Sequence, residues 1–175
     1  MSIAVVVAVT LFAAAVKWLM VGAYKPRVEP LWSHFVRRAE FVTGLYENTA
    51  APLLITPLLG TPFAGWILRL FGVKVGKRAF IATTFFTEFD LVHIGNDAVI
   101  SQDVSLQTHL FEDRIMKMSH VRIGDDCAVG ESGVVLYDTV MEPGSSLGAL
   151  SLMMKGETLP QDTHWVGAPA QKEAA

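Results

Sequence analysis

The chain has 175 residues, of which 51% are hydrophobic and 18% charged, and its formal net charge is −3. This composition excludes a disordered linker and a collagen-like chain, and the small negative charge indicates no general surface for nucleic acid. The single cysteine, Cys127, excludes an intramolecular disulfide framework, and the cysteine and histidine spacings indicate no metal site. The mean hydropathy of +0.40 is high for an ordinary soluble domain, so the position of the excess apolar residues matters.

Much of this excess lies at the start of the chain. Residues 3–22 contain one charge, Lys17, and as a helix they would span about 30 Å, the thickness of a bilayer core. We therefore expect a transmembrane or membrane-embedded helix in residues 1–24, in contact with membrane lipids. A signal peptide and a buried core helix are the alternatives. Basic residues follow in residues 25–38, which predicts bacterial inner-membrane association with the catalytic domain on the cytoplasmic side.

Residues 25–72 are predicted to form a helical lead-in. An amphipathic helix is expected over residues 31–46, with Arg37, Arg38 and Glu40 on a solvated face. Residues 52–71 are apolar but contain three prolines and two glycines, so short helical pieces are expected there. These pieces would suit either a membrane surface or the open end of a protein core.

From residue 73 onward an apolar residue recurs at every sixth position, and glycine often follows it. The series in one register is Ile123, Val129, Val135, Met141, Leu147, Met153, Leu159 and Trp165. This period predicts a triangular parallel β-helix, in which each hexapeptide supplies one short strand and one corner and three hexapeptides complete a coil. We expect four to five coils over residues 73–170, followed by a tail, residues 171–175.

The period of six is interrupted twice. Thirteen residues separate Ile81 from Ile94, and 17 separate Leu106 from Ile123. The second interruption contains HLFEDRIMKMSHVR, which we interpret as a loop extruded from the wall of the β-helix. A loop on a rigid scaffold is a common position for a functional site.

The hexapeptides, the extruded loop with a histidine and the terminal WVGAPAQ together resemble left-handed β-helix acyltransferases. The resemblance implies a mainly β fold, a left-handed parallel β-helix of hexapeptide repeats preceded by helices. It also implies that the loop histidine acts as general base, and that the chain forms a homotrimer.

A narrower resemblance covers nearly the whole chain. The segments KPRVEPLWSHFVRRAEF, ENTAAPLLITPLLGTPF, TEFDLVHIG, SLQTHLFEDRIMK and SLMMKGETLP look like the membrane-bound C-terminal region of ε-poly-L-lysine synthetase-type (Pls/PosA family) non-ribosomal peptide synthetases. The chain has no adenylation domain and no usual carrier motif, so it resembles one module of a longer enzyme. The resemblance implies adenylation and carrier domains as partners, a phosphopantetheine-linked aminoacyl thioester as donor, and tandem modules that form a pseudo-trimer.

His109 is the first catalytic candidate, because acyl transfer to an amine needs a base and a neutral imidazole serves well near neutral pH. Glu88 and Asp90 lie at the other interruption and are assigned to the catalytic group, where they could orient His109 or hold the substrate ammonium. The alternative is that they are exposed turn carboxylates. We assign Gln107, Glu112, Asp113 and Arg114 to substrate binding. Lys117, Trp165, Gly167 and Pro169 are assigned to the donor cofactor, with solvated or capping roles as the alternatives.

The predicted function is therefore an acyltransferase-like domain of a non-ribosomal peptide synthetase that forms an amide or isopeptide bond. One alternative is a stand-alone acetyltransferase that uses acyl-CoA. The other is a non-catalytic β-helix scaffold for assembly at the membrane.

Overall fold

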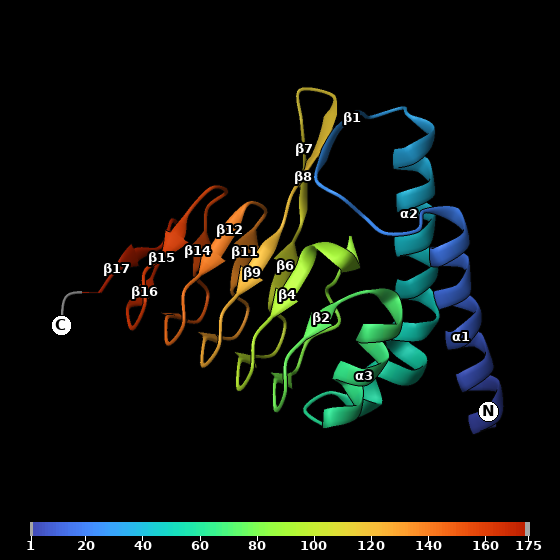
Figure 1. Cartoon of the computed structure of the whole chain (residues 1–175), viewed down its shortest axis with the longest axis horizontal. Coiled ribbons are helices and arrows are strands. Elements are labelled where there is room, and N and C mark those ends of the chain that lie inside the picture. The colour runs from blue at the N-terminus through green and yellow to red at the C-terminus, as the bar shows by residue number, and fades with distance from the viewer. Residues whose placement is uncertain (1, 174–175) are drawn as a thin grey trace.

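Helices gather at one end of the molecule, and a stack of short strands extends away from them (Figure 1). The structure is a computed structural model that describes residues 2–173. Residue 1 and residues 174–175, which belong to the predicted segments 1–24 and 171–175, lie outside the described residues. The helices are α1 (Ile3–Met20), α2 (His34–Asn48), the π-helix η1 (Ala51–Ile55), the 3-10 helix η2 (Thr56–Leu58), α3 (Pro62–Phe71) and the 3-10 helix η3 (Phe89–Leu91).

The strands are short. They are β1 (Arg27–Pro30), β2 (Lys74–Val75), β3 (Phe80–Ile81), β4 (Val92–Ile94), β5 (Val99–Ile100), β6 (Ser105–Gln107), β7 (His109–Glu112), β8 (Ile115–Met118), β9 (Val121–Ile123), β10 (Ala128–Val129), β11 (Val134–Leu136), β12 (Thr139–Met141), β13 (Ser146–Leu147), β14 (Leu152–Met153), β15 (Thr158–Leu159), β16 (His164–Val166) and β17 (Gln171–Lys172).

α1 lies beside α2 (Figure 1) and also contacts α3 and η1. It is buried along one narrow stripe, and most of its residues are exposed. The buried stripe is Thr10, Ala13, Ala14 and Lys17, which follows the i, i+3, i+4, i+7 spacing of one helix face. Among the described residues, α1 is the one helix long and apolar enough to cross a membrane, a property that signal sequences and core helices share.

The proline-rich segment 52–71 is divided into η1, η2 and α3, as its sequence predicts. α3 begins at Pro62, where a missing N–H costs nothing, and ends at Gly72, whose φ is +115°. The segment covers the first coil of strands, because α3 contacts β2 and β3 and the N–H of Gly60 donates to the carbonyl of Ile81. Its outer face, with Phe63 and Trp66, stays exposed.

Three sheets of parallel strands form the walls of a parallel β-helix. Their orders are β2-β4-β9-β12-β15, β3-β5-β10-β13-β16 and β6-β11-β14. Neighbouring strands come from consecutive coils, since Ala128 pairs with Ser146 and Ser146 pairs with His164, each 18 residues later. Every residue of the predicted six-residue series is buried except Trp165, which is half-buried. The predicted β-helix period is thus confirmed.

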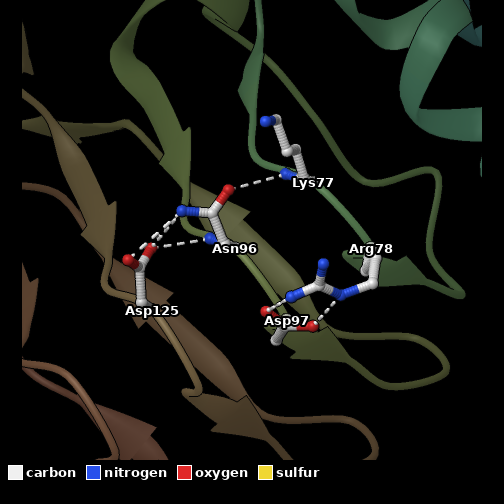
Figure 2. Close-up of polar contacts among 5 residues, drawn as sticks. All are labelled: Lys77, Arg78, Asn96, Asp97 and Asp125. Carbon is white, nitrogen blue, oxygen red and sulfur yellow. Dashed lines mark hydrogen bonds and ion pairs between the residues drawn. The ribbon is translucent and has the colours of Figure 1, made fainter.

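Figure 2 shows how consecutive coils are joined at one corner. Asn96 accepts the backbone N–H of Lys77 and donates its own backbone N–H to Asp125, while Arg78 pairs with Asp97. The backbones approach closely here, so that a Cβ at Gly95 would lie 2.5 Å from the carbonyl of Gly124. This approach explains why glycine follows the inward residue.

The segment extruded after Leu106 is a β-hairpin, which corrects the expectation of a loop. β7 and β8 pair antiparallel across Asp113 and Arg114, whose φ values of 51° and 62° suit a tight hairpin turn. β1 adds as a third strand beside β8 (Figure 1). A partner strand from outside the repeat therefore stabilises the extruded segment.

Candidate active site

The extruded hairpin begins at His109, whose Nδ1 lies 2.8 Å from Oε2 of Glu88. Glu88 directly precedes η3, and its side chain is 1% exposed, against 22% for His109. An ionised carboxylate only accepts hydrogen bonds, so Nδ1 carries the proton and donates. In the neutral imidazole the other ring nitrogen, Nε2, is then the one that can accept a proton.

Two threonines support this carboxylate. Thr108, which is fully buried, donates its hydroxyl to Oε2 of Glu88 at 2.6 Å. Because that proton is committed, the hydroxyl of Thr87 donates to Oγ1 of Thr108 at 2.8 Å, and the backbone N–H of Glu88 donates to the same oxygen. Sequence reasoning missed both threonines, since their type and spacing are unremarkable without the fold.

Burial by itself opposes ionisation of Glu88. Its hydrogen bonds with His109 and Thr108, together with the charge that His109 carries when protonated, nevertheless hold its pKa below the usual value of 4.5. Glu88 is therefore a carboxylate at neutral pH, and it fixes both the tautomer and the direction of the His109 ring.

Two cavities meet at His109. The first, of about 300 Å³, is mainly apolar and is lined by Glu47, Phe85, Phe86, Thr87, Ser105, Leu106, Gln107, His109, Leu110 and Phe111. The second, of about 240 Å³, carries carboxylates and is lined by Glu40, Thr43, Gly44, Glu47, Glu88, His109 and Met116. The structure thus brings Gln107, Glu88 and His109 together as predicted candidates.

α2 contributes the far wall of the second cavity, which the sequence did not indicate. Glu40 was expected on a solvated face, and Glu47 was not singled out. Both lie on the side of α2 that faces His109, and both remain exposed. The amphipathic pattern marks which face of a helix is polar, but it carries no information on which strand that face meets.

Asp90 is not beside His109, which corrects its assignment to the catalytic group. Its Oδ2 accepts a hydrogen bond from Nζ of Lys17 at 2.6 Å and from the backbone N–H of Tyr24 at 3.0 Å. Asp90 and Glu88 flank Phe89 on one tight turn, and this turn directs their side chains to different partners.

The charged residues of the hairpin have no hydrogen bond or ion pair with His109 among the contacts of residues 2–173. Glu112 forms ion pairs with Lys117 and Lys155, which leaves neither Glu112 nor Lys117 free in this structure. Asp113 and Arg114 are exposed at the hairpin tip, about 13 Å along the strand from His109 at about 3.3 Å per residue. Neither cavity at His109 includes these residues.

The three residues assigned to the donor near the end of the chain lie in the last coil. Trp165 belongs to β16, and the carbonyl of Gly167 accepts the N–H of Leu152 in β14. Pro169 follows in the same turn, and none of the three lines either cavity at His109. Within residues 2–173, no group of three or more metal-ligating side chains is found.

No family model matches the chain. It is 42% identical over 160 residues to the δ-poly-L-ornithine synthetase of Acinetobacter baumannii strain AB307-0294, which covers 91% of this chain and 12% of that protein. This chain therefore spans only a small part of that relative. The finding confirms the resemblance to polyamino-acid synthetases that the sequence motifs suggest.

Two solved structures of similar fold are acetyltransferases. A maltose O-acetyltransferase from Clostridium difficile 630 matches with a TM-score of 0.63 and 16% identity, over 90% of this chain and 95% of that one. A hexapeptide-repeat acetyltransferase from Vibrio cholerae matches with a TM-score of 0.57 and 15% identity, over 97% and 92%. The chain is thus similar in sequence to one segment of a polyamino-acid synthetase, and its fold is that of hexapeptide-repeat acetyltransferases.

Proposed function

We propose that the chain is an acyltransferase module that joins an amine to an acyl thioester, with His109 as general base. The observation that carries the proposal is the hydrogen bond between His109 and the buried Glu88, at the wall that two cavities share. Each of the two cavities can receive one substrate beside the imidazole of His109. A scaffold without catalysis has no need of such a pair.

The proposed reaction needs no covalent enzyme intermediate. The neutral amine of the acceptor attacks the thioester carbonyl carbon and forms the new C–N bond, while Nε2 of His109 removes a proton from the nitrogen. The C–S bond then breaks, and the thiolate leaves with the proton returned by His109. Glu88 stabilises the imidazolium in between and keeps the ring aimed at the acceptor.

We favour a carrier-bound aminoacyl thioester as the donor, because the similar relative is named a polyornithine synthetase. In this proposal the adenylation and carrier domains of a longer synthetase are the partners, and the product is an amide or isopeptide. The donor's phosphopantetheine arm would enter the mainly apolar cavity beside Gln107, which could hold the donor amide.

Acyl-CoA is the second candidate donor. A hexapeptide-repeat acetyltransferase from Vibrio cholerae of similar fold was solved with acetyl coenzyme A, and a galactoside acetyltransferase of similar fold with coenzyme A. In both proposals Trp165, Gly167 and Pro169 remain candidates for the distal part of the donor. Lys117 can serve the donor only if it leaves Glu112.

The wider setting is also part of the proposal. We propose a left-handed β-helix held at a membrane by α1, with the site on the cytoplasmic side. We propose that β-helices pack side by side in a trimer. The trimer would be either a homotrimer of separate chains or a pseudo-trimer of tandem modules in one chain. The exposed apolar surface of α1 and the exposed Phe63 and Trp66 of α3 support the membrane contact.

The test is product formation by the full chain in detergent, with an aminoacyl-pantetheine donor and a diamine acceptor. We expect His109→Ala to lower kcat by about 10²–10⁴, the usual contribution of a general base. His164→Ala is the matched control, because His164 lies on β16 in the last coil and is exposed. Unchanged activity of His109→Ala would refute the assignment, and activity with acetyl-CoA alone would select the second donor.

A further inference from the structure

A buried ion pair joins α1 to the turn that carries Glu88. Lys17 lies in the last turn of α1 with its side chain fully buried, and its Nζ donates to Oδ2 of Asp90 at 2.6 Å. The same oxygen accepts the backbone N–H of Tyr24 at 3.0 Å. A buried charge without its partner is strongly destabilising, so this contact holds α1 in one place relative to Asp90.

The packing around the pair leaves little room for adjustment. A Cβ at Gly72 would collide with Oδ1 of Asp90 and would lie 3.1 Å from Nζ of Lys17. The same Nζ lies 3.3 Å from the ring centroid of Trp18, and Nε1 of Trp18 donates to the carbonyl of Leu70 at 2.8 Å. The ends of α1 and α3 are therefore locked around Asp90.

One tight turn carries both Glu88 and Asp90. The N–H of Leu91 donates to the carbonyl of Glu88 at 2.9 Å and closes the turn at η3. The two apolar side chains of η3 are fully buried against the core. We therefore expect a displacement of Asp90 to displace Glu88, and with it the ring of His109.

Tyr24, in the link that follows α1, also lies near the carboxylate of Asp90. Its side chain is buried, and its hydroxyl has no hydrogen-bond partner in the part of the chain that the structure describes. Burial, followed by the negative charges of Glu88 and Asp90, raises its pKa. The chain leaving α1 therefore contacts the Asp90 carboxylate directly.

We infer that Lys17 is a positioning residue for the acyl-transfer site, and that the place of α1 sets the geometry of His109 through Asp90 and Glu88. This inference rests on the proposed role of His109. It makes α1 part of the control of the reaction as well as an apolar helix that suits a membrane. A tilt of α1 would displace His109 through the ion pair between Lys17 and Asp90.

The kinetic test uses the full chain in lipid nanodiscs. Lys17→Met keeps a long side chain without charge, and Asp90→Asn keeps an oxygen for the N–H of Tyr24. We expect each variant to lower kcat between about ten- and a hundredfold with KM unchanged, because misplacement of about 1 Å has effects of this size. The double variant should lose no more than either single variant, since the two residues act as a unit.

A second measurement does not depend on turnover. In ¹⁵N-histidine-labelled protein, the Nδ1–H resonance of His109 should shift in Lys17→Met, because its hydrogen bond to Glu88 is displaced. If the wild type transfers no acyl group, the proposed function fails, and the resonance still decides whether Lys17 positions His109. Thr10→Val is the matched control, as Thr10 is buried on the same stripe of α1 and its hydroxyl donates within the helix to Val6.

The inference is overturned if folded Lys17→Met has the wild-type kcat and an unchanged His109 resonance. A shift of similar size in Thr10→Val would also overturn it, since general disturbance of α1 would then explain the effect. If Lys17→Met does not fold, the double variant decides, because it leaves no unpaired buried charge. Wild-type kcat and resonance in that variant refute the role of the pair.

Discussion

Nδ1 of His109 and Oε2 of Glu88 lie 2.8 Å apart, and the side chain of Glu88 is almost completely buried. The proton on Nδ1 therefore points into the protein, and the lone pair on Nε2 is left for a substrate. A 180° rotation of the ring would leave the buried carboxylate of Glu88 without the hydrogen bond that Nδ1 donates.

Glu88→Gln keeps the size of the side chain and removes its charge. A glutamine amide can offer an N–H to His109 and select the other tautomer, so we expect kcat to fall by about 10²–10⁴ with KM for both substrates unchanged. Glu131→Gln, at an exposed corner of the β-helix, serves as the control and should retain wild-type kcat. A Glu88→Gln enzyme with full activity would remove Glu88 from the mechanism.

Glu88 should also make stability depend on pH. Its pKa is lower in the folded chain than the ordinary 4.5, so its contribution is present above pH 4.5 and is lost as the pH falls through the lowered pKa. Denaturant titrations at pH 6 and at pH values below 4.5 should show this loss in the wild type. The loss should be smaller in Glu88→Gln, and equal losses in both proteins would contradict the account.

His93 gives a second acid-sensitive region at higher pH. Burial, with the positive charges around Lys74 and Arg122, lowers the pKa of His93 from 6.5 to about 4. Between these values the unfolded chain binds a proton that the folded chain does not, so stability falls as the pH drops from 6.5 to about 4. His93→Gln should flatten this part of the stability curve, whereas His164→Gln, at an exposed site, should leave the wild-type slope. A wild-type slope in His93→Gln would refute this assignment.

Two glycine substitutions should change stability in opposite directions. Gly95→Ala places a Cβ 2.5 Å from the carbonyl of Gly124 in the next coil, which we expect to destabilise the fold by about 1–3 kcal/mol. In Gly44→Ala the new Cβ would have no atom within 4 Å. Because this residue lies within α2, alanine should stabilise the fold by up to about 1 kcal/mol. Chemical denaturation of both variants tests this, and a neutral Gly95→Ala would show that the coils can move apart.

The fold was predictable where short-range repetition determines it. An apolar residue that recurs at every sixth position lies beside another apolar residue one coil, or three repeats, later. Val129 and Leu147 could therefore be assigned to the interior from the sequence alone. The first interruption was harder. The position six residues before Ile94, where the period predicts an inward apolar residue, is Glu88, whereas Phe86, which pairs with Leu106, takes the inward place.

The site was predictable only in part. His109 stood out by residue type and by its place after Leu106. The pairing of β1 with β8 and the approach of α2 join segments that are distant in the sequence, and no local pattern encodes them. The buried Lys17 in an apolar helix required a carboxylate partner, but the sequence offered no means to choose Asp90.

The last coil ends in a way that limits how such modules can be joined. After β16 the chain turns back, and β17 pairs antiparallel with it at Trp165 and Lys172. The outer edge of β14 is also occupied, because Leu152 exchanges hydrogen bonds with Gly167 and Ala170. At the opposite end, α3 and η2 lie over the first coil. Strand-by-strand extension into a fibre is therefore blocked on two of the three faces at the C-terminal end of the β-helix.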